Sequence, residues 1–262
     1  MRCPLLILIE AVRVFLGVAM LAYASWSDVR TREVSDLTWV VFGGLGLMLD
    51  FYEVAAGRLT PLSLAVPVLS STALSFALGY LGLFGGADFK AFVALALLQP
   101  YQPRLLRPAL GVVSAIYPLT VFSNSALAGA SFTIVVLVRN LISARSGSPL
   151  FEGHKSEAVW RRFLILITGV KVRLDSVRGP PFQYPLEVPL GGDATERGFV
   201  LMPDFEDDEA AVEAFQWLRR AGIEEVWVSH TLPFLVFISL GFLSALLLGD
   251  VALWTLQLML SR

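Results

Sequence analysis

The sequence predicts an all-α polytopic membrane protein with a small α+β or irregular insertion before its last helix. Of its 262 residues, 56% are hydrophobic and only 16% are charged, whereas a typical soluble domain has about 25% charged residues. Several apolar stretches reach the length of about 20 residues that a helix needs to cross a bilayer. A polar stretch, residues 143–230, interrupts this pattern. Most of the chain is therefore expected to lie in a membrane.

The expected crossing helices follow one another along the chain. They cover residues 5–27, 36–54, 62–84, 119–142 and 232–258. A sixth, shorter helix is expected over residues 88–100, because a helix that begins at a buried acid needs fewer residues to reach the far side of the membrane. It could instead be one part of a broken helix that continues through the apolar residues 111–117. The total is about six transmembrane helices.

These boundaries divide the chain into three parts. Residues 1–142 hold the first five helices, residues 143–230 form the polar insertion, and residues 231–262 hold the last helix. The first apolar stretch lacks a small-residue cleavage site, so it is expected to stay as a helix rather than to be a signal peptide. Lys and Arg are concentrated on the side of the insertion. The positive-inside rule therefore predicts a multi-pass cell-membrane protein with the insertion in the cytoplasm and both termini outside.

The insertion has two segments with recognisable patterns. Residues 159–172 are apolar enough to be a packed strand or helix. Residues 206–222 have acids at their start and Arg219-Arg220 near their end. This distribution is typical of a helix, because the charges complement the helix dipole.

Several ionisable residues interrupt the apolar stretches. Glu10 and Arg13 are three residues apart and share a helix face, which predicts a neutralising pair turned toward the bundle. Asp50, Glu53 and Asp250 lie near the ends of their predicted helices. Their side chains are therefore expected to reach the membrane surface.

The residue inventory argues against several classes of protein. A net charge of -2 and the lack of a basic, aromatic-rich patch argue against a nucleic-acid partner. The only cysteine is Cys3, which excludes an internal disulfide. His154 and His230 are the only histidines and are interpreted as surface or interface residues of the insertion. No metal or other cofactor is expected, and the serine-hydrolase motif Gly-x-Ser-x-Gly does not occur.

An acid at membrane depth marks the first candidate site. The sequence Gly85-Gly86-Ala87-Asp88 follows one long apolar stretch and precedes another, residues 91–98. An ionisable side chain costs about 2.5–3.5 kcal/mol or more at the centre of a membrane helix, so it normally faces a protein interior or a water-filled cavity. Asp88 is therefore a candidate functional residue.

A second acid is expected on the same side of the membrane. Asp28 ends the first predicted helix and Asp88 begins the fourth, and the chain between them forms one out-and-back pair of helices. Two carboxyl groups that share a site cannot easily both ionise, so one stays protonated while the other acts as a base. An aspartyl hydrolase needs this division of roles. An equally good interpretation makes Asp28 a solvated helix-end acid beside Arg30 and Arg32.

The residues around Asp88 have a predicted supporting role. Glycines recur there, at Gly79, Gly82, Gly85 and Gly86. They predict a small-residue packing face followed by a stretch where the backbone can bend and admit an extended substrate strand. Lys90, two residues after Asp88, could bias the charge of the pair or contact a phospholipid headgroup.

These motifs give the chain a family resemblance. The segment 28–36 with Trp39, the element 85–90 and the late segment 226–250 resemble those of the archaeal preflagellin (type IV prepilin-like) peptidases. The resemblance runs nearly end to end. It implies a fold of six membrane helices with a polar insertion before the last one, and it implies an intramembrane aspartyl protease of the Gly-x-Gly-Asp class.

The resemblance also implies an activity and its residues. Such enzymes remove the short basic leader of archaellin and pilin precursors at the cytoplasmic face, and their two catalytic aspartates match Asp28 and Asp88. The residues that match the motif around the second aspartate are Gly85, Gly86, Ala87 and Lys90. Ala87 stands where the family has glycine, which removes the freedom to adopt a positive φ and could restrict loop opening or substrate choice.

Two questions stay open from the sequence. A non-catalytic carrier or channel could use Asp88 alone as an ion or proton site. Residues 143–229 contain fourteen acids against ten Lys or Arg. These acids could attract a basic leader over a distance, or those at 204–213 could simply start a helix.

Overall fold

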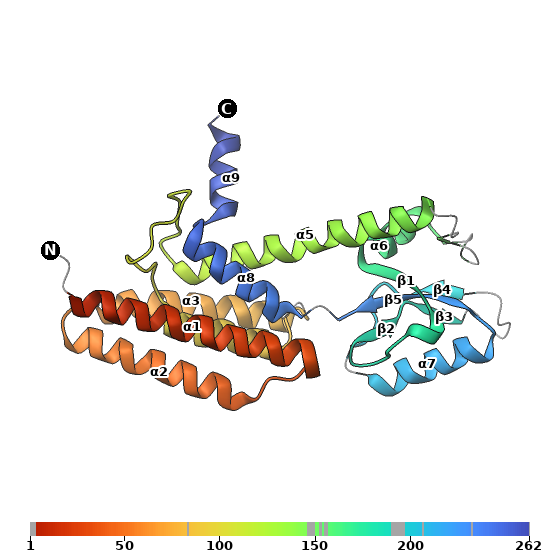
Figure 1. The fold of residues 1–262 in the computed structure, drawn as a ribbon, viewed down its shortest axis with the longest axis horizontal. Helices are drawn as coiled ribbons and strands as arrows, with labels where there is room; N and C mark the ends of the chain where they lie inside the picture. The colour runs from red at the N-terminus through yellow and green to blue at the C-terminus, as the bar shows by residue number, and fades with distance from the viewer. Residues whose placement is uncertain are drawn as a thin grey trace. The chain divides into compact units, whose positions relative to one another are not determined.

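The computed structural model describes residues 4–82, 84–145, 150–151, 154, 157–189, 197–205, 207–231 and 233–261 (Figure 1). Its helices are α1 (Pro4–Thr31), α2 (Asp36–Ala55), α3 (Pro61–Tyr80), α4 (Gly86–Leu98), α5 (Tyr117–Arg145), α6 (Val159–Thr168), α7 (Asp208–Arg220), α8 (Phe234–Leu247) and α9 (Val251–Leu260). Its strands are β1 (Gly169–Arg173), β2 (Gln183–Pro185), β3 (Glu187–Pro189), β4 (Arg197–Phe199) and β5 (Glu225–His230). The chain forms two compact units. The helical unit is Met1–Gly129 with Pro233–Arg262, and the α+β unit is Ala130–Leu232.

The long helices confirm a polytopic membrane protein. Among the described residues, four helices are long and apolar enough to cross a membrane, namely α1, α2, α3 and α5. The pair α8 and α9, bent by 61°, raises this number to five if it counts as one span. α4 has 13 residues, about 20 Å at 1.5 Å per residue, which is less than the ~30 Å hydrocarbon core. The helical continuation considered at 111–117 is wrong, because residues 99–116 contain no helix.

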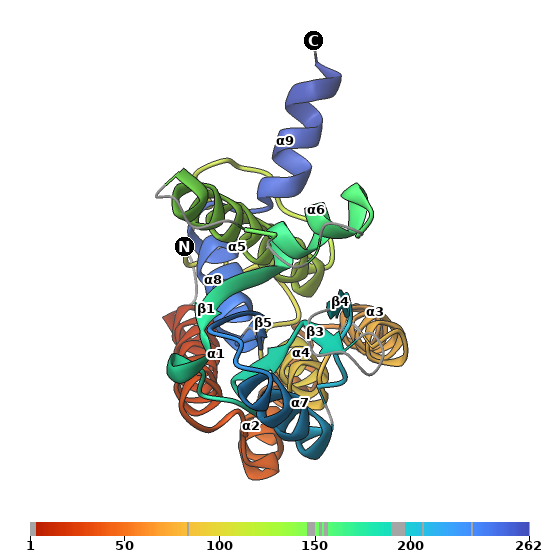
Figure 2. The ribbon, with the colours of Figure 1, turned by 90° about the vertical axis from the view of Figure 1, so that its right-hand side faces the viewer.

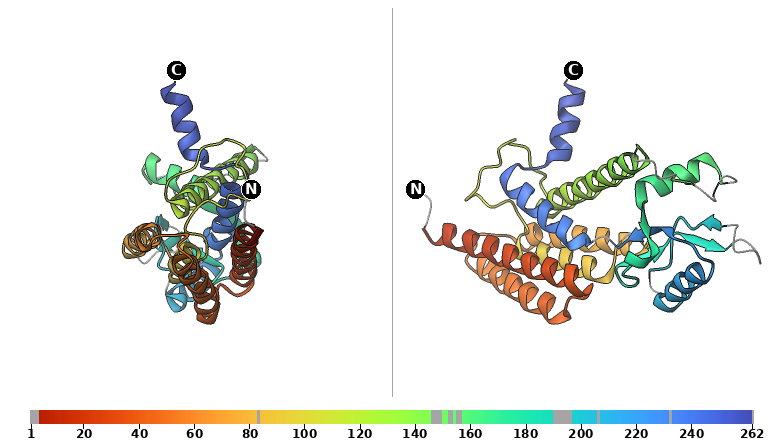
Figure 3. Two further views of the ribbon diagram at one scale, coloured as in Figure 1. Left: turned by 90° about the vertical axis from the view of Figure 1, so that its left-hand side faces the viewer. Right: turned by 45° about the vertical axis from the view of Figure 1, so that its right-hand side comes forward.

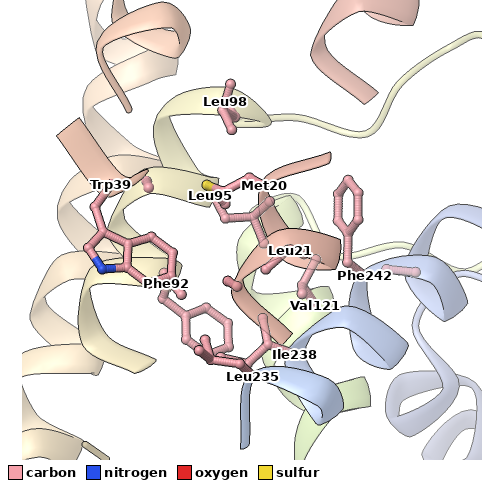
Figure 4. Close-up of a cluster of buried hydrophobic side chains, with 14 of the residues drawn as sticks. Met20, Leu21, Trp39, Phe92, Leu95, Leu98, Val121, Leu235, Ile238 and Phe242 are labelled. Carbon is pink, nitrogen blue, oxygen red and sulfur yellow. The ribbon is translucent and has the colours of Figure 1, made fainter. Parts of the chain in front are cut away.

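The helical unit is built around α4. This helix packs against α1, α2, α3 and α8, and Figure 2 shows it between α1, α2 and α3. Its buried side chains belong to the apolar core drawn in Figure 4, which includes Phe92, Leu95, Leu98, Met20, Leu21, Val121, Ile238 and Phe242. The α2 backbone comes so close that a Cβ atom at Gly46 would lie 2.7 Å from the Leu97 backbone. Glycine is therefore required at position 46.

The last predicted helix is broken. Between α8 and α9, Gly249 has a φ of 96°, and Asp250 caps α9 by accepting a hydrogen bond from the Leu253 N–H at 2.9 Å. The Asp250 N–H donates to the Val112 carbonyl at 2.7 Å, so the loop before α5 supplies a partner for a backbone donor at the break. Figure 3 shows α9 turning away from α8. The single helix expected over 232–258 and the surface position expected for Asp250, which is 2% exposed, are both wrong.

A buried ion cluster replaces the ion pair expected within α1. Arg13 is 0% exposed, and its Nη2 donates to Asp50 Oδ1 and to Glu53 Oε2, both at 2.7 Å. Its Nη1 donates to the Leu98 carbonyl at the end of α4, at 2.9 Å. The expected pair of Arg13 with Glu10 is therefore wrong. The surface positions expected for Asp50 and Glu53 are wrong for the same reason.

Further contacts enclose this cluster. The Tyr101 hydroxyl donates to Glu53 Oε2 at 2.6 Å, and the Arg13 guanidinium lies 5.7 Å from the centre of the Tyr101 ring. Glu10 accepts a hydrogen bond from the Leu105 N–H at 2.8 Å. The acids of α1 and α2 at this end therefore face the protein interior and the loop after α4.

The α+β unit has a small antiparallel sheet. β5 is the central strand of the order β1-β5-β2, and β3 pairs with β4. α7 contributes to a core formed by Leu174, Phe215, Leu218, Val226 and Val228. Asp207 caps α7 by accepting a hydrogen bond from the Ala210 N–H at 2.9 Å, and Arg219 and Arg220 occupy its last turn. The predicted helix at this position is confirmed, and the apolar stretch 159–172 contains both α6 and most of β1.

The histidines of this unit do not lie on an open surface. His154 is 1% exposed, and its Nε2 lies 3.5 Å from Glu187 Oε2. Burial raises the pKa of the Glu187 carboxyl, although the nearby Arg197 guanidinium opposes this effect. His230 is half-buried and shares a 2.8 Å hydrogen bond with Gln183. The surface position expected for His154 is therefore wrong.

The Arg13 cluster predicts a large effect on stability. We expect Arg13→Met to destabilise the detergent-solubilised protein by about 3–5 kcal/mol, because loss of one member of a buried ion pair leaves the others unpaired. The matched control is Arg30→Met, since Arg30 is exposed on the same helix and its guanidinium lies 5.0 Å from the centre of the Trp26 ring. Its cost should be about 1 kcal/mol or less. Thermal unfolding followed by circular dichroism measures both, and equal losses would contradict the prediction.

Candidate active site

The first candidate aspartate lies where α1 ends. Asp28 belongs to the last turn of α1, and Arg32 follows with a left-handed backbone, φ 61°. This turn returns the Arg32 side chain toward Asp28, with Nη1 3.9 Å from Asp28 Oδ1. The Ser27 hydroxyl donates to the Glu33 carbonyl at 2.6 Å and fixes the turn. A bulky residue at positive φ is strained, and such strain gathers at functional sites.

The second candidate aspartate lies in the first turn of α4. Asp88 Oδ2 accepts a hydrogen bond from the Gly85 N–H at 3.1 Å, which satisfies one of the free donors at the start of the helix. Gly85 has a φ of -74° and Ala87 is already helical. The backbone bends earlier, at Gly82, where φ is 70°.

The lengths of two antiparallel helices bring these ends together. Arg13 of α1 contacts Leu98 at the end of α4. Asp28 lies fifteen residues after Arg13, and Asp88 lies ten residues before Leu98. At 1.5 Å per residue these distances are about 22 and 15 Å. Asp28 therefore lies slightly beyond the first turn of α4, at the end that carries Asp88.

The two carboxyl groups are near enough to affect one another. Asp28 acts on Asp88 through its charge. The Leu235 N–H, at the start of α8, lies near the Asp28 carboxyl. Both aspartates are half-buried, and in the part of the chain that the structure describes no hydrogen bond joins them directly.

An aromatic cluster beside these aspartates was not predicted. Phe84 stacks on Phe92 with ring centres 5.5 Å apart, and its ring centre lies 5.2 Å from that of Phe234. Phe84 directly precedes Gly85, and Phe234 directly precedes Leu235. The cluster therefore connects the segment that supports Asp88 with the one that lies near Asp28. The sequence shows these phenylalanines but gives no sign that the loop after α3 meets the start of α8.

The remaining predicted residues have simpler surroundings. Lys90 Nζ lies 2.6 Å from Asp36 Oδ1, and the side chains are 42% and 73% exposed, so this pair contributes only about 0–1 kcal/mol. The packing face expected at Gly79 and Gly82 is wrong, because a Cβ atom at either would meet nothing within 4 Å. Within the described ranges, no group of three or more His, Cys, Asp or Glu is placed to hold a metal ion.

Comparison with known proteins identifies the family. Residues 15–134 match the model of the type IV leader peptidase family, and residues 161–251 match that of the archaeal peptidase A24 C-terminus, type II. The first match includes both candidate aspartates. The chain therefore belongs to the type IV leader peptidase family, and it is a membrane protease of the aspartic type.

Individual relatives agree with this assignment. The chain is 24% identical to a preflagellin peptidase of Methanococcus maripaludis, over 90% of this chain and 94% of that protein. It is 25% identical to a preflagellin peptidase of Methanocaldococcus jannaschii, over 89% and 92%. The prepilin peptidase EppA of Methanothermobacter thermautotrophicus is 34% identical over 54% of this chain and 39% of its own length. The resemblance noted in the sequence is confirmed, and a non-catalytic carrier or channel is not favoured.

The helical backbone at Ala87 predicts the effect of restoring the family's glycine. Ala87→Gly should lower stability by about 1 kcal/mol or less and should not speed leader cleavage, because position 87 needs no positive φ. Gly82→Ala, at φ 70°, should be the more harmful change, because a side chain there is strained. Thermal unfolding and initial cleavage rates measure both effects. A several-fold faster Ala87→Gly enzyme would show that alanine restricts the loop.

Proposed function

We propose that Asp28 and Asp88 are the catalytic aspartates of this leader peptidase. The observation that supports this most directly is geometric, because the contact of Arg13 with Leu98 sets α1 against α4 so that Asp28 and Asp88 lie at adjoining ends of the two helices. Two other buried acids of the helical unit, Asp50 and Glu53, are already paired with Arg13. Asp28 and Asp88 are half-buried rather than enclosed, so water can reach them.

The proposed reaction uses one ionised and one protonated carboxyl group. The carboxylate takes a proton from a water whose oxygen attacks the scissile carbonyl carbon, while the carboxylic acid donates its proton to the carbonyl oxygen. The tetrahedral intermediate then collapses as the leaving nitrogen is protonated, without a covalent bond to the enzyme. Gly85 and Gly86 border this position. A Cβ at Gly86 would meet nothing within 4 Å, so the backbone there is open to an extended substrate strand.

The substrates we propose are archaellin and pilin precursors with a short basic leader before a hydrophobic segment. The names of the relatives support this class. An exposed acid near the site also suits a basic leader, since Glu33 lies in the turn between α1 and α2 and is exposed. In this proposal the α+β unit lies in the cytoplasm, both termini lie outside, and cleavage occurs at the cytoplasmic face.

The catalytic pair is tested by removing each charge without removing the side chain. Asp28→Asn and Asp88→Asn should each slow leader cleavage by about 10²-fold or more, with the protein still folded. The amide oxygen introduced at position 88 can still accept the Gly85 hydrogen bond, so the start of α4 is preserved. Asp36→Asn is the matched control, because it changes an exposed acid of the same region and should keep near-normal activity.

The measurement uses purified enzyme in detergent and a precursor with a basic leader. Mass spectrometry of the shortened product gives the rate and the cleavage position. Substantial cleavage by either variant of the pair would falsify it. Loss of cleavage in Asp36→Asn to the same degree would show that the assay reports damage to the loop rather than loss of catalytic chemistry.

Recognition of the basic leader predicts a salt-dependent effect at Glu33. Glu33→Gln should slow cleavage several-fold at low salt and should match the unmodified enzyme at high salt, because the Debye length falls from about 10 Å at 0.1 M to about 3 Å at 1 M. Glu209→Gln is the control, since Glu209 is an exposed acid in the first turn of α7. It should have no effect if the acids there serve to start α7. A slower Glu209→Gln enzyme at low salt would assign the guiding role to the insertion instead.

A further inference from the structure

α6 presents an apolar face that the described residues of its own unit leave exposed. Its inner side contributes Ile165, which is 0% exposed, to an apolar core. On the other side Val159, Trp160 and Phe163 are 81%, 60% and 55% exposed. At about 100° per residue these three positions lie on one face of the helix. A contiguous group of exposed large apolar side chains indicates an interaction surface, whereas scattered ones need no explanation.

A buried asparagine fixes α6 against α5. Asn140 Nδ2 donates to the Leu166 carbonyl at 2.8 Å and to the Gly169 carbonyl at 2.7 Å. These carbonyls lie at the carboxyl end of α6, where helices leave acceptors unsatisfied. Asn140 is 2% exposed. The end of α6 is therefore held at the level of residue 140 of α5, and both segments belong to the α+β unit.

Residue 140 lies close to the point where α5 leaves the membrane core. α5 has 29 residues, whereas the hydrocarbon core takes about 20. A crossing of about 20 residues that begins at Tyr117 ends just before Arg139. The side chain of Arg139 is exposed and can reach the headgroups. Beyond this arginine the surface is still apolar, with Leu141 and Ile142 46% and 60% exposed.

We propose that α6 and the last turns of α5 form a membrane-docking surface. It would lie at the boundary between the headgroups and the acyl chains of the bilayer that α5 crosses, with α6 along the membrane plane. The exposed face of α6 then continues the apolar surface of Leu141 and Ile142. Trp160 has the side chain that is enriched at this boundary. Arg139 and Arg145 are exposed beside it and match the negative charge of phospholipid headgroups.

The test measures what surrounds α6 in a vesicle. Cys3→Ser removes the only native thiol, and Trp160→Cys or Phe163→Cys introduces a site for a nitroxide spin label. Val135→Cys, 60% exposed on α5, is the lipid reference, and Val212→Cys, 43% exposed on α7, is the water reference. The full chain is reconstituted in vesicles of phosphatidylcholine and phosphatidylglycerol. Electron paramagnetic resonance then compares collisions with oxygen and with a water-soluble nickel chelate.

The possible outcomes distinguish lipid, water and protein as the surroundings of the exposed face of α6. We expect labels at 160 and 163 to collide more with oxygen than with the nickel chelate, as at 135, and the label at 212 to show the reverse. Labels that behave like 212 would place α6 in water and overturn the proposal. Labels shielded from both reagents would place the face against protein, such as a second copy of the chain, and would also overturn it. Val159→Cys, on the same face, replaces either variant that does not fold, and circular dichroism checks each.

Discussion

The burial of α4 is the constraint on which the helical unit depends. A 13-residue helix surrounded by four others cannot satisfy the free groups at its buried carboxyl end with bulk water. At its start Asp88 accepts the Gly85 N–H, and at its end Arg13 donates to the Leu98 carbonyl. Both charges have the sign that the helix dipole favours. The candidate catalytic acid therefore also has a structural role, which explains why an acid can lie at this position.

Arg13 connects this constraint to the other aspartate. Because it joins α1 to the far end of α4, the register of the two antiparallel helices is set there. Asp28, on the same helix as Arg13, then reaches the end of α4 that carries Asp88. Asp50 and Glu53 hold Arg13 from α2. An ion cluster about 20 Å along α1 from the site thus helps to position the two aspartates.

The sequence predicts what depends on local pattern and length. Apolar runs predict the long membrane helices, and end charges predict the helix at 206–222. The even number of crossings between Asp28 and Asp88 predicts that both acids lie on one side of the membrane. The partners of Arg13 do not, because Glu10 is close in sequence while Asp50 and Glu53 become neighbours only after α2 packs. The break at Gly249 is missed for a similar reason. The apolar run continues through the break, and the group that pairs with the Asp250 N–H is the carbonyl of the distant Val112.

The candidate site draws on both segments that match family models. Asp28 and Asp88 lie in the match to residues 15–134, but Leu235, whose N–H lies near the Asp28 carboxyl, belongs to α8, within the match to 161–251. Phe234, next to it, contacts Phe84 beside the Gly85 motif. The first segment alone would therefore carry the two acids without Leu235 near Asp28 and without Phe234 in the aromatic cluster. The return of the chain into the helical unit after the α+β unit completes the surroundings of the pair.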